Sequence, residues 1–405
     1  CGPTSISERL PRSDSAPSIL QMRALFWFRK GLRLHDNPAL AAALAGSPTH
    51  LYPVYVLDPL HGAAGSGASA NRAHFLLESL QDLDQSLRAL GSRLVVLRGD
   101  PSVELPRAMQ QWRIDRLAYE METDEGWSTP YAKARDERIC ALAAEANVEV
   151  VTRWGHTLCD LDALLARHPG GKPTKVYSAF LGHLERQLAA EPIALVDAPA
   201  RLPPHGELAA ADALGVPSVA ELGLAPRSSA VILRGGETEA LARMEAHLKR
   251  GAWVAKFEKP STSPTEMDAF APQTRATTCL SPYLTLGCLS ARTFHLRLAA
   301  VYRAHPVHAK PPVSLHGQLY VGWPFVCFAG APGDSVTAAA HSPQVLARVL
   351  LCRGARHAQL WPDGGQSRLP TGAMGRRRRA ARGLARRAHG VPDRTGIDAS
   401  RSQFP

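Results

Sequence analysis

The feature that most constrains the fold is the alternation, between residues 24 and 152, of short apolar runs with longer helix-like stretches. The apolar runs are ALFWF, HLYPVYVLD, RLVVLRG, DRLAYEME and VEVVT, at residues 24–28, 50–58, 93–99, 115–122 and 148–152. The stretches between them, at 38–46, 71–91, 102–113 and 129–146, have helical length, and in 71–91 the leucines recur at three- and four-residue steps. This order predicts an α/β fold: a Rossmann-like open parallel sheet of five strands with helices on both faces.

The segment after the first run, RKGLRLHDNPAL at residues 29–40, is the first place to look for a ligand site. Small ligands bind outside the carboxyl ends of the strands in such sheets. The segment lacks the glycine-rich fingerprints of dinucleotide and P-loop sites, so an ordinary strand-to-helix turn is the favoured interpretation. Asp36 or Asn37 is expected to cap a helix that begins at Pro38.

Composition narrows the class of protein further. The apolar runs are far shorter than the roughly 20 residues needed to cross a bilayer, so no membrane association is expected. Seven cysteines are scattered without a C-x-x-C pair, and the histidines show no ligand spacing, so neither disulfides nor a metal site is expected. Reduced thiols indicate the nucleus or the cytoplasm, with an organelle left open.

The net charge of +11 is concentrated in residues 321–405, which hold thirteen Arg, four Asp and neither Lys nor Glu. The part of the chain predicted to fold, before residue 321, therefore carries little excess positive charge.

The segment LFWFRKGLRLHDNPAL resembles the first strand, turn and helix of the cryptochrome and DNA photolyase family. Further segments follow in the family's order: TPYAKARDERI, GGKPTKVYSAFL, GGETEAL, WVAKFEKPSTSP, TTCLSPYLTLGCLSARTF and KPPVSLHGQL. The resemblance covers about residues 24–320 and is greatest to the animal-type branch, which includes the (6-4) photolyases.

The resemblance implies an N-terminal α/β domain that can hold an antenna chromophore, of the folate or deazaflavin type, and an all-helical domain that holds FAD. It implies one of two functions: light-driven repair of pyrimidine photoproducts in damaged DNA, the work of a carbon–carbon lyase, or blue-light signalling through protein partners. The corresponding boundaries are a disordered leader at 1–23, the α/β domain at 24–153, a connector at 154–235, the first part of the helical FAD-binding domain at 236–320 and a divergent, disordered tail at 321–405.

The resemblance also implies cofactor-binding residues. The family's flavin-phosphate loop falls on Thr277, Thr278, Cys279, Leu280 and Ser281, where hydroxyls and main-chain N–H groups near a helix start would bind a pyrophosphate. Gln318 falls on a family position near the flavin. Lys256 is a candidate phosphate contact, with a solvated lysine as the alternative. No catalytic residue can be assigned.

The tryptophans Trp27, Trp112, Trp127, Trp154 and Trp253 match none of the family's redox tryptophans, so packing in the core or at its rim is the expected role of each.

The resemblance ends at Tyr320. The family continues with a Trp-Arg-Glu-Phe helix, whereas this chain has Val321, Gly322, Trp323 and Pro324, and a proline breaks a helix. We hypothesise intron retention near Val321, because the composition of residues 321–405 is typical of GC-rich sequence read in an unintended frame. The alternative is an Arg-rich nuclear-targeting or DNA-binding segment around GRRRRAARGLARR. The first hypothesis predicts an impaired product that retains little FAD, or an inactive remnant in which only the α/β domain folds.

Overall fold

The computed structural model describes residues 22–59, 70–121, 130–167, 176–210, 212, 215–224, 226, 233–258 and 277–320. The expectations for the leader before residue 22, for Trp127 and for residues 321–405 lie outside the described residues.

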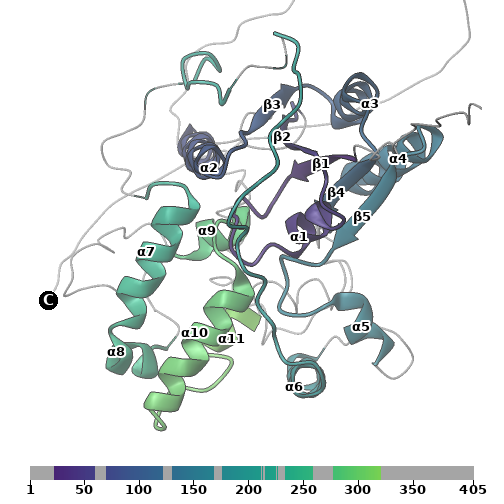
Figure 1. Cartoon of the computed structure of the whole chain (residues 1–405). Helices are drawn as coiled ribbons and strands as arrows, with labels where there is room; N and C mark the ends of the chain where they lie inside the picture. Colours follow the sequence, from purple (N-terminus) through teal and green to yellow (C-terminus); the bar gives the residue numbers. More distant parts are fainter. Residues whose placement is uncertain are drawn as a thin grey trace, which may run out of the picture. The chain divides into compact units, whose positions relative to one another are not determined.

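Five parallel strands form one sheet (Figure 1). They are β1 (Arg23–Phe28), β2 (His50–Leu57), β3 (Val95–Arg98), β4 (Arg116–Glu120) and β5 (Glu149–Arg153). The strand order is β3-β2-β1-β4-β5, so β1 is central and pairs with both β2 and β4. The predicted open parallel sheet is confirmed, and the order reverses at β1, where such sheets place their ligand crevice.

Helices cover both faces of this sheet, as expected. They are α1 (Pro38–Leu44), α2 (Ala70–Ala89), α3 (Pro101–Trp112) and α4 (Pro130–Glu145). Successive side chains of β1 enter different cores: Phe26 and Phe28 join the core that includes α1 and α2, while Leu25 and Trp27 join the core that includes α3 and α4. A strand with both faces buried has to be apolar throughout, which explains the continuous run ALFWF.

Four of the tryptophans can be compared directly with the packing expectation. Trp27 and Trp112 are buried in the core under α3 and α4, and Trp112 stacks on Tyr52 with ring centroids 5.0 Å apart. Trp154 and Trp253 are partly buried against the other core. All four occupy packing positions.

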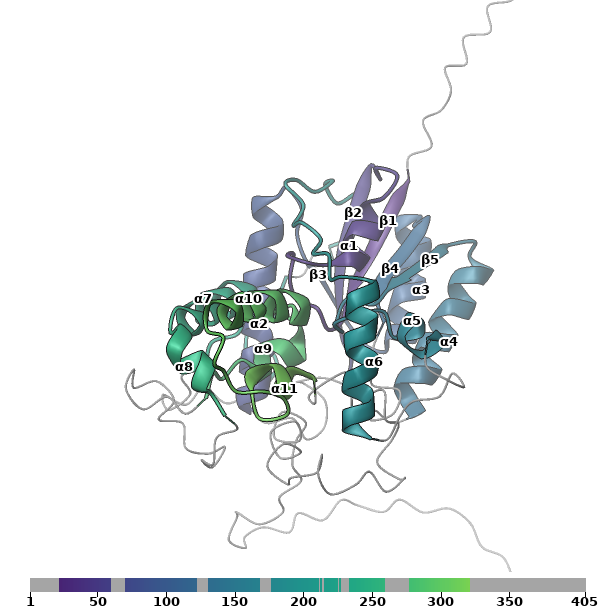
Figure 2. The ribbon, with the colours of Figure 1, turned by 90° about the horizontal axis from the view of Figure 1, so that it is seen from below.

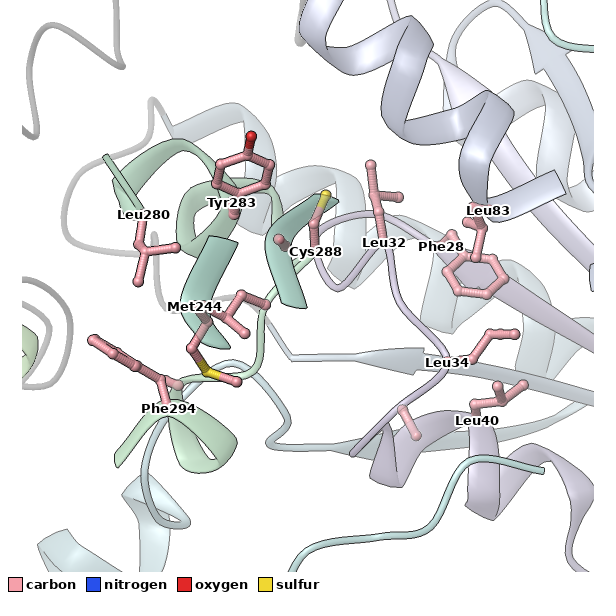
Figure 3. Packing of buried hydrophobic residues seen from close by; sticks show 14 of the residues in the cluster. Phe28, Leu32, Leu34, Leu40, Leu83, Met244, Leu280, Tyr283, Cys288 and Phe294 are labelled. Carbon is pink, nitrogen blue, oxygen red and sulfur yellow. The ribbon is translucent and has the colours of Figure 1, made fainter. Parts of the chain in front are cut away.

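The remaining helices are α5 (Leu161–Ala166), α6 (Tyr177–Ala190), α7 (Glu237–Leu248), α8 (Gly251–Lys256), α9 (Ser281–Leu286), α10 (Ala291–Ala304) and α11 (Leu315–Tyr320). Helix α10 packs beside α7, α8 and α11 (Figure 2). The core that begins under β1 continues into these helices through Met244, Tyr283 and Phe294 (Figure 3).

Two stretches within the part predicted to be helical each form two helices. Residues 279–304 form α9 and α10, because Gly287 takes a left-handed conformation at φ +66° that ends α9, and Ser290 caps a new helix. Residues 235–253 likewise divide into α7 and α8 around Arg250. In the part of the chain that the structure describes, no helix is long and apolar enough to span a membrane.

Candidate functional site

The loop between β1 and α1 carries the side chains that the sequence placed at the crevice. Asn37 caps α1, because its Oδ1 accepts a hydrogen bond from the Leu40 amide at 2.9 Å and Pro38 occupies the first helical turn. Asp36 does not cap this helix. It has φ +47° and is almost fully buried, with its carboxylate turned toward α10.

Arg33 is fully buried and bonds to its own loop and to three other segments. Its guanidinium donates to the carbonyl oxygens of Gly287, Asp36 and Gly155 at 3.0, 3.0 and 2.8 Å, and to Glu120 Oε1 at 3.0 Å. The planar guanidinium suits this arrangement because it donates in several fixed directions at once. Arg33 therefore ties the ends of β4 and β5 to the turn between α9 and α10.

Glu120 ends β4 inside this network. Burial raises the pKa of its carboxyl group, although the positive charges of Arg33, Arg292 and Arg29 act to lower it. A Cβ at Gly31 or at Gly155 would clash with the carboxylate, so both positions require glycine.

A second ion pair links the same loop to α10. Arg292 donates to both carboxylate oxygens of Asp36, at 2.9 and 2.8 Å, and the Ser290 hydroxyl donates to the same carboxylate. A carboxylate of the helical part also binds this loop: Glu237 of α7 accepts from the backbone amides of Leu34 and His35 at 2.8 and 2.9 Å and contacts the His35 ring. Sequence reasoning missed these partners, because the residues of each pair lie more than 200 positions apart.

The residues assigned to the phosphate loop are contiguous and lead directly into α9. Thr277 Oγ1 accepts from the Cys279 amide at 3.5 Å, and Thr278 Oγ1 accepts from the Leu280 amide at 3.4 Å. Cys279 has φ +52°. The Leu280 side chain points into the core, so only its backbone can bind a ligand, whereas Ser281 is exposed at the start of α9.

Gln318 lies in α11, which packs against α10. Its Nε2 is buried and has no hydrogen-bond partner among the described residues. Buried amide nitrogens are rarely left without an acceptor, so this atom is a candidate donor to a bound ligand.

An aromatic cluster joins α10 to α11 beside Gln318. The rings of His295 and His316 stack with centroids 4.7 Å apart, and Tyr320 Oη lies 3.4 Å from His295 Nδ1. Burial lowers the pKa of both histidines to about 4, so the stacked pair is uncharged at neutral pH.

Lys256 ends α8 with its side chain exposed. Within the described ranges no hydrogen bond or ion pair links Lys256 to residues 277–281 or to Gln318. The structure thus places residues 277–281 at the start of α9 and Gln318 on α11 against α10, and leaves the role of Lys256 as a prediction.

The strand ends near Arg29 form a polar area at the carboxyl edge of the sheet that adjoins Glu120, whose carbonyl oxygen accepts from the Arg29 guanidinium. The Arg29 guanidinium lies over the rings of Trp27 and Tyr119, 4.7 and 4.6 Å from their centroids, and pairs with Asp136 of α4 at 2.7 Å. This area lies where the α/β fold places small ligands.

Comparison with known proteins decides the family. Residues 24–201 match the DNA photolyase family model. The chain is 43% identical to Cryptochrome-2 of Gallus gallus over 301 residues, which cover 73% of this chain and 49% of that protein. It is 44% identical to the (6-4)DNA photolyase of Oryza sativa subsp. japonica over 321 residues, which cover 75% of this chain and 55% of that protein.

This chain belongs to the cryptochrome and DNA photolyase family. The crystal structure of the Synechocystis cryptochrome matches the fold with a TM-score of 0.57 at 24% identity, covering 70% of this chain and 56% of that one. The predicted membership and fold class are confirmed. The chain spans about half the length of the curated cryptochrome and photolyase relatives it matches.

Proposed function

We propose that this chain is a blue-light flavoprotein whose FAD is bound between the Thr277–Ser281 loop and Gln318. The observation that carries the proposal is the buried Gln318 Nε2, which has no acceptor within the described residues and sits at a family position near the flavin. Members of the family bind FAD. An amide N–H is a suitable donor to the carbonyl oxygens and ring nitrogens of an isoalloxazine.

The threonine hydroxyls support the other half of this site. A hydroxyl has one donor hydrogen and two acceptor positions. Because Thr277 Oγ1 and Thr278 Oγ1 each accept from a backbone amide, their own hydrogens are directed away from those amides. Two hydroxyl donors in adjacent positions are suited to a pyrophosphate oxygen.

The proposed reaction is light-driven repair of (6-4) pyrimidine photoproducts in DNA. Bound FAD supplies the light-driven electron transfer that splits the unwanted bond. The residues of this chain bind the cofactor at its phosphates, orient its ring through Gln318 and keep α11 packed against α10. The rice (6-4)DNA photolyase, at 44% identity, supports this reaction.

Blue-light signalling through protein partners is the second candidate, supported by the 43% identity to Cryptochrome-2. The two functions differ in how the flavin is used rather than in how it is bound. Illumination of the FAD-loaded chain with an oligonucleotide that contains a (6-4) photoproduct tests the choice: restoration of the two pyrimidines supports repair, and an unchanged lesion contradicts it.

We also propose that the α/β part holds an antenna chromophore of the folate or deazaflavin type at the carboxyl edge of the sheet. Arg29 with its ring and carboxylate neighbours supports this location. Mass spectrometry of the small molecules released from purified protein tests it, because either chromophore has a characteristic mass.

The FAD content of purified protein tests the cofactor assignment. Residues 321–405 lack the family's further flavin-contacting motifs, so we expect less than one FAD per chain after purification and additional binding when FAD is supplied. A one-to-one flavin content without added FAD would contradict an impaired site. No binding of added FAD would contradict the assignment of the site.

A further inference from the structure

The two halves of the proposed FAD site lie on opposite sides of the turn between α9 and α10. Helix α9 follows the Thr277–Ser281 loop and ends at Gly287, whereas α10 begins after Ser290 and packs against α11, which carries Gln318. The position of residues 287–290 therefore sets the spacing between the phosphate loop and Gln318.

The loop after β1 holds the α9 side of this turn. The backbone amides of Gly31 and Leu32 both donate to the Leu286 carbonyl, at 3.0 and 3.1 Å, and Arg33 Nη1 donates to the Gly287 carbonyl at 3.0 Å. These three bonds satisfy carbonyls at the end of α9, which have no partners within the helix.

Asp36 of the same loop holds the α10 side. Its carboxylate receives the Ser290 hydroxyl and two nitrogens of Arg292. Ser290 Oγ also accepts from the amides of Arg292 and Thr293, at 3.1 and 3.2 Å, as the N-cap of α10. Every hydrogen-bonding position of this hydroxyl is therefore used, which fixes the first turn of α10 to Asp36.

Asp36 is itself held rigidly. Its amide donates to the Val196 carbonyl at 2.9 Å, and its Oδ1 accepts from the Val196 amide at 3.1 Å. Its φ of +47° is uncommon for a residue with a side chain, and such a conformation persists only where the surrounding contacts impose it. The carboxylate is thus a fixed anchor and not a mobile surface charge.

We propose that Asp36 is a positioning residue for the flavin, acting through Ser290 and Arg292 to fix the spacing between the Thr277–Ser281 loop and Gln318. The inference rests on the proposed function, because it requires FAD to bridge both halves. A ligand that engages two sites gains affinity from their fixed spacing, whereas a fragment that engages one site does not.

The test compares FAD with its two fragments, ADP and riboflavin, in the full chain and in the Asp36→Asn variant, by titration calorimetry. We expect Asp36→Asn to weaken FAD binding about tenfold and to change the affinity for each fragment less than twofold. Asp160→Asn is the matched control, because Asp160 caps α5 outside the network and asparagine is an equally good cap. It should leave all three affinities unchanged.

Unchanged FAD affinity in Asp36→Asn would overturn the inference and leave the proposed function intact. Equal weakening of FAD and both fragments would also overturn it, because a general loss of structure affects every ligand. If the parent chain binds no FAD, the proposed function fails first and the inference with it. If circular dichroism shows that Asp36→Asn is unfolded, Arg292→Lys takes its place in the test. This substitution keeps the positive charge and loses the two-point contact with Asp36, so we expect it to weaken FAD binding and to leave the affinities for ADP and riboflavin nearly unchanged.

Discussion

Arg33 and Glu120 form an ion pair at 3.0 Å in which neither side chain is more than 4% exposed. The pair lies where the loop after β1, the ends of β4 and β5 and the turn after α9 meet. Removing one member of a buried pair is strongly destabilising, because the remaining charge loses both its partner and its access to water.

Arg33→Met is therefore expected to lower the free energy of unfolding by about 3–5 kcal/mol, measured by urea denaturation. Arg88→Met is the control, since Arg88 pairs with Asp84 on the exposed face of α2 and such pairs contribute about 0–1 kcal/mol. Equal losses in the two variants would contradict a structural role for the buried pair.

Glu120 should give stability an unusual dependence on pH. Burial raises the pKa of its carboxyl group above the unfolded value of about 4.3, so the folded state binds the proton more tightly. The free energy of unfolding should then fall as pH rises from about 4.3 through the folded pKa, and Glu120→Gln should remove this decline. Parallel pH profiles for the parent and Glu120→Gln would disprove the prediction; Glu149→Gln, at an exposed ion pair, should leave the profile unchanged.

The stacked histidines should make stability fall as pH decreases, opposite to the effect of Glu120. Burial lowers the pKa values of His295 and His316 to about 4, below the unfolded value of about 6.5. The unfolded chain then takes up protons first, so their contribution to stability is lost as pH falls from about 6.5 to about 4. His316→Phe should lose less stability over this range than the parent does, and His183→Phe, on α6 outside the cluster, should behave like the parent. An unchanged loss in His316→Phe would refute the assignment.

Gly287 should tolerate no side chain. It has φ +66°, and a Cβ there would collide with the backbone of Gly31. We expect Gly287→Ala to lower the melting temperature and to cost more than about 1 kcal/mol, because the left-handed strain and the clash add. Gly215→Ala is the matched control, since its added methyl group would meet nothing within 4 Å and its φ is not left-handed. Similar melting temperatures for the two variants would rule out the close approach.

The sheet could be predicted because its signals are local. Each apolar run became a strand, with boundaries within about two residues, and Asn37 with Pro38 began α1 as expected. The break inside 279–304 could not be predicted, because the apolar pattern continues through Gly287. What requires glycine there is the backbone of Gly31, far away in the sequence.

The same limit applies to the candidate site. Family motifs located Thr277–Ser281 and Gln318, since those positions lie in contiguous matching segments. The role of Asp36 was hidden, because the sequence offers Asp36 and Asn37 as equivalent helix caps and only the fold brings Arg292 to one of them. Contacts between distant segments are set by packing, and no local pattern encodes them.

Titration of the chain with FAD tests the central claim most directly. We expect one FAD to bind per chain, and Gln318→Ala to weaken binding about tenfold, because a buried donor to the ligand is lost. Gln111→Ala, at a side chain that accepts from Arg107 on the surface of α3, should bind FAD like the parent. Equal FAD affinity in the parent and in Gln318→Ala would contradict the account.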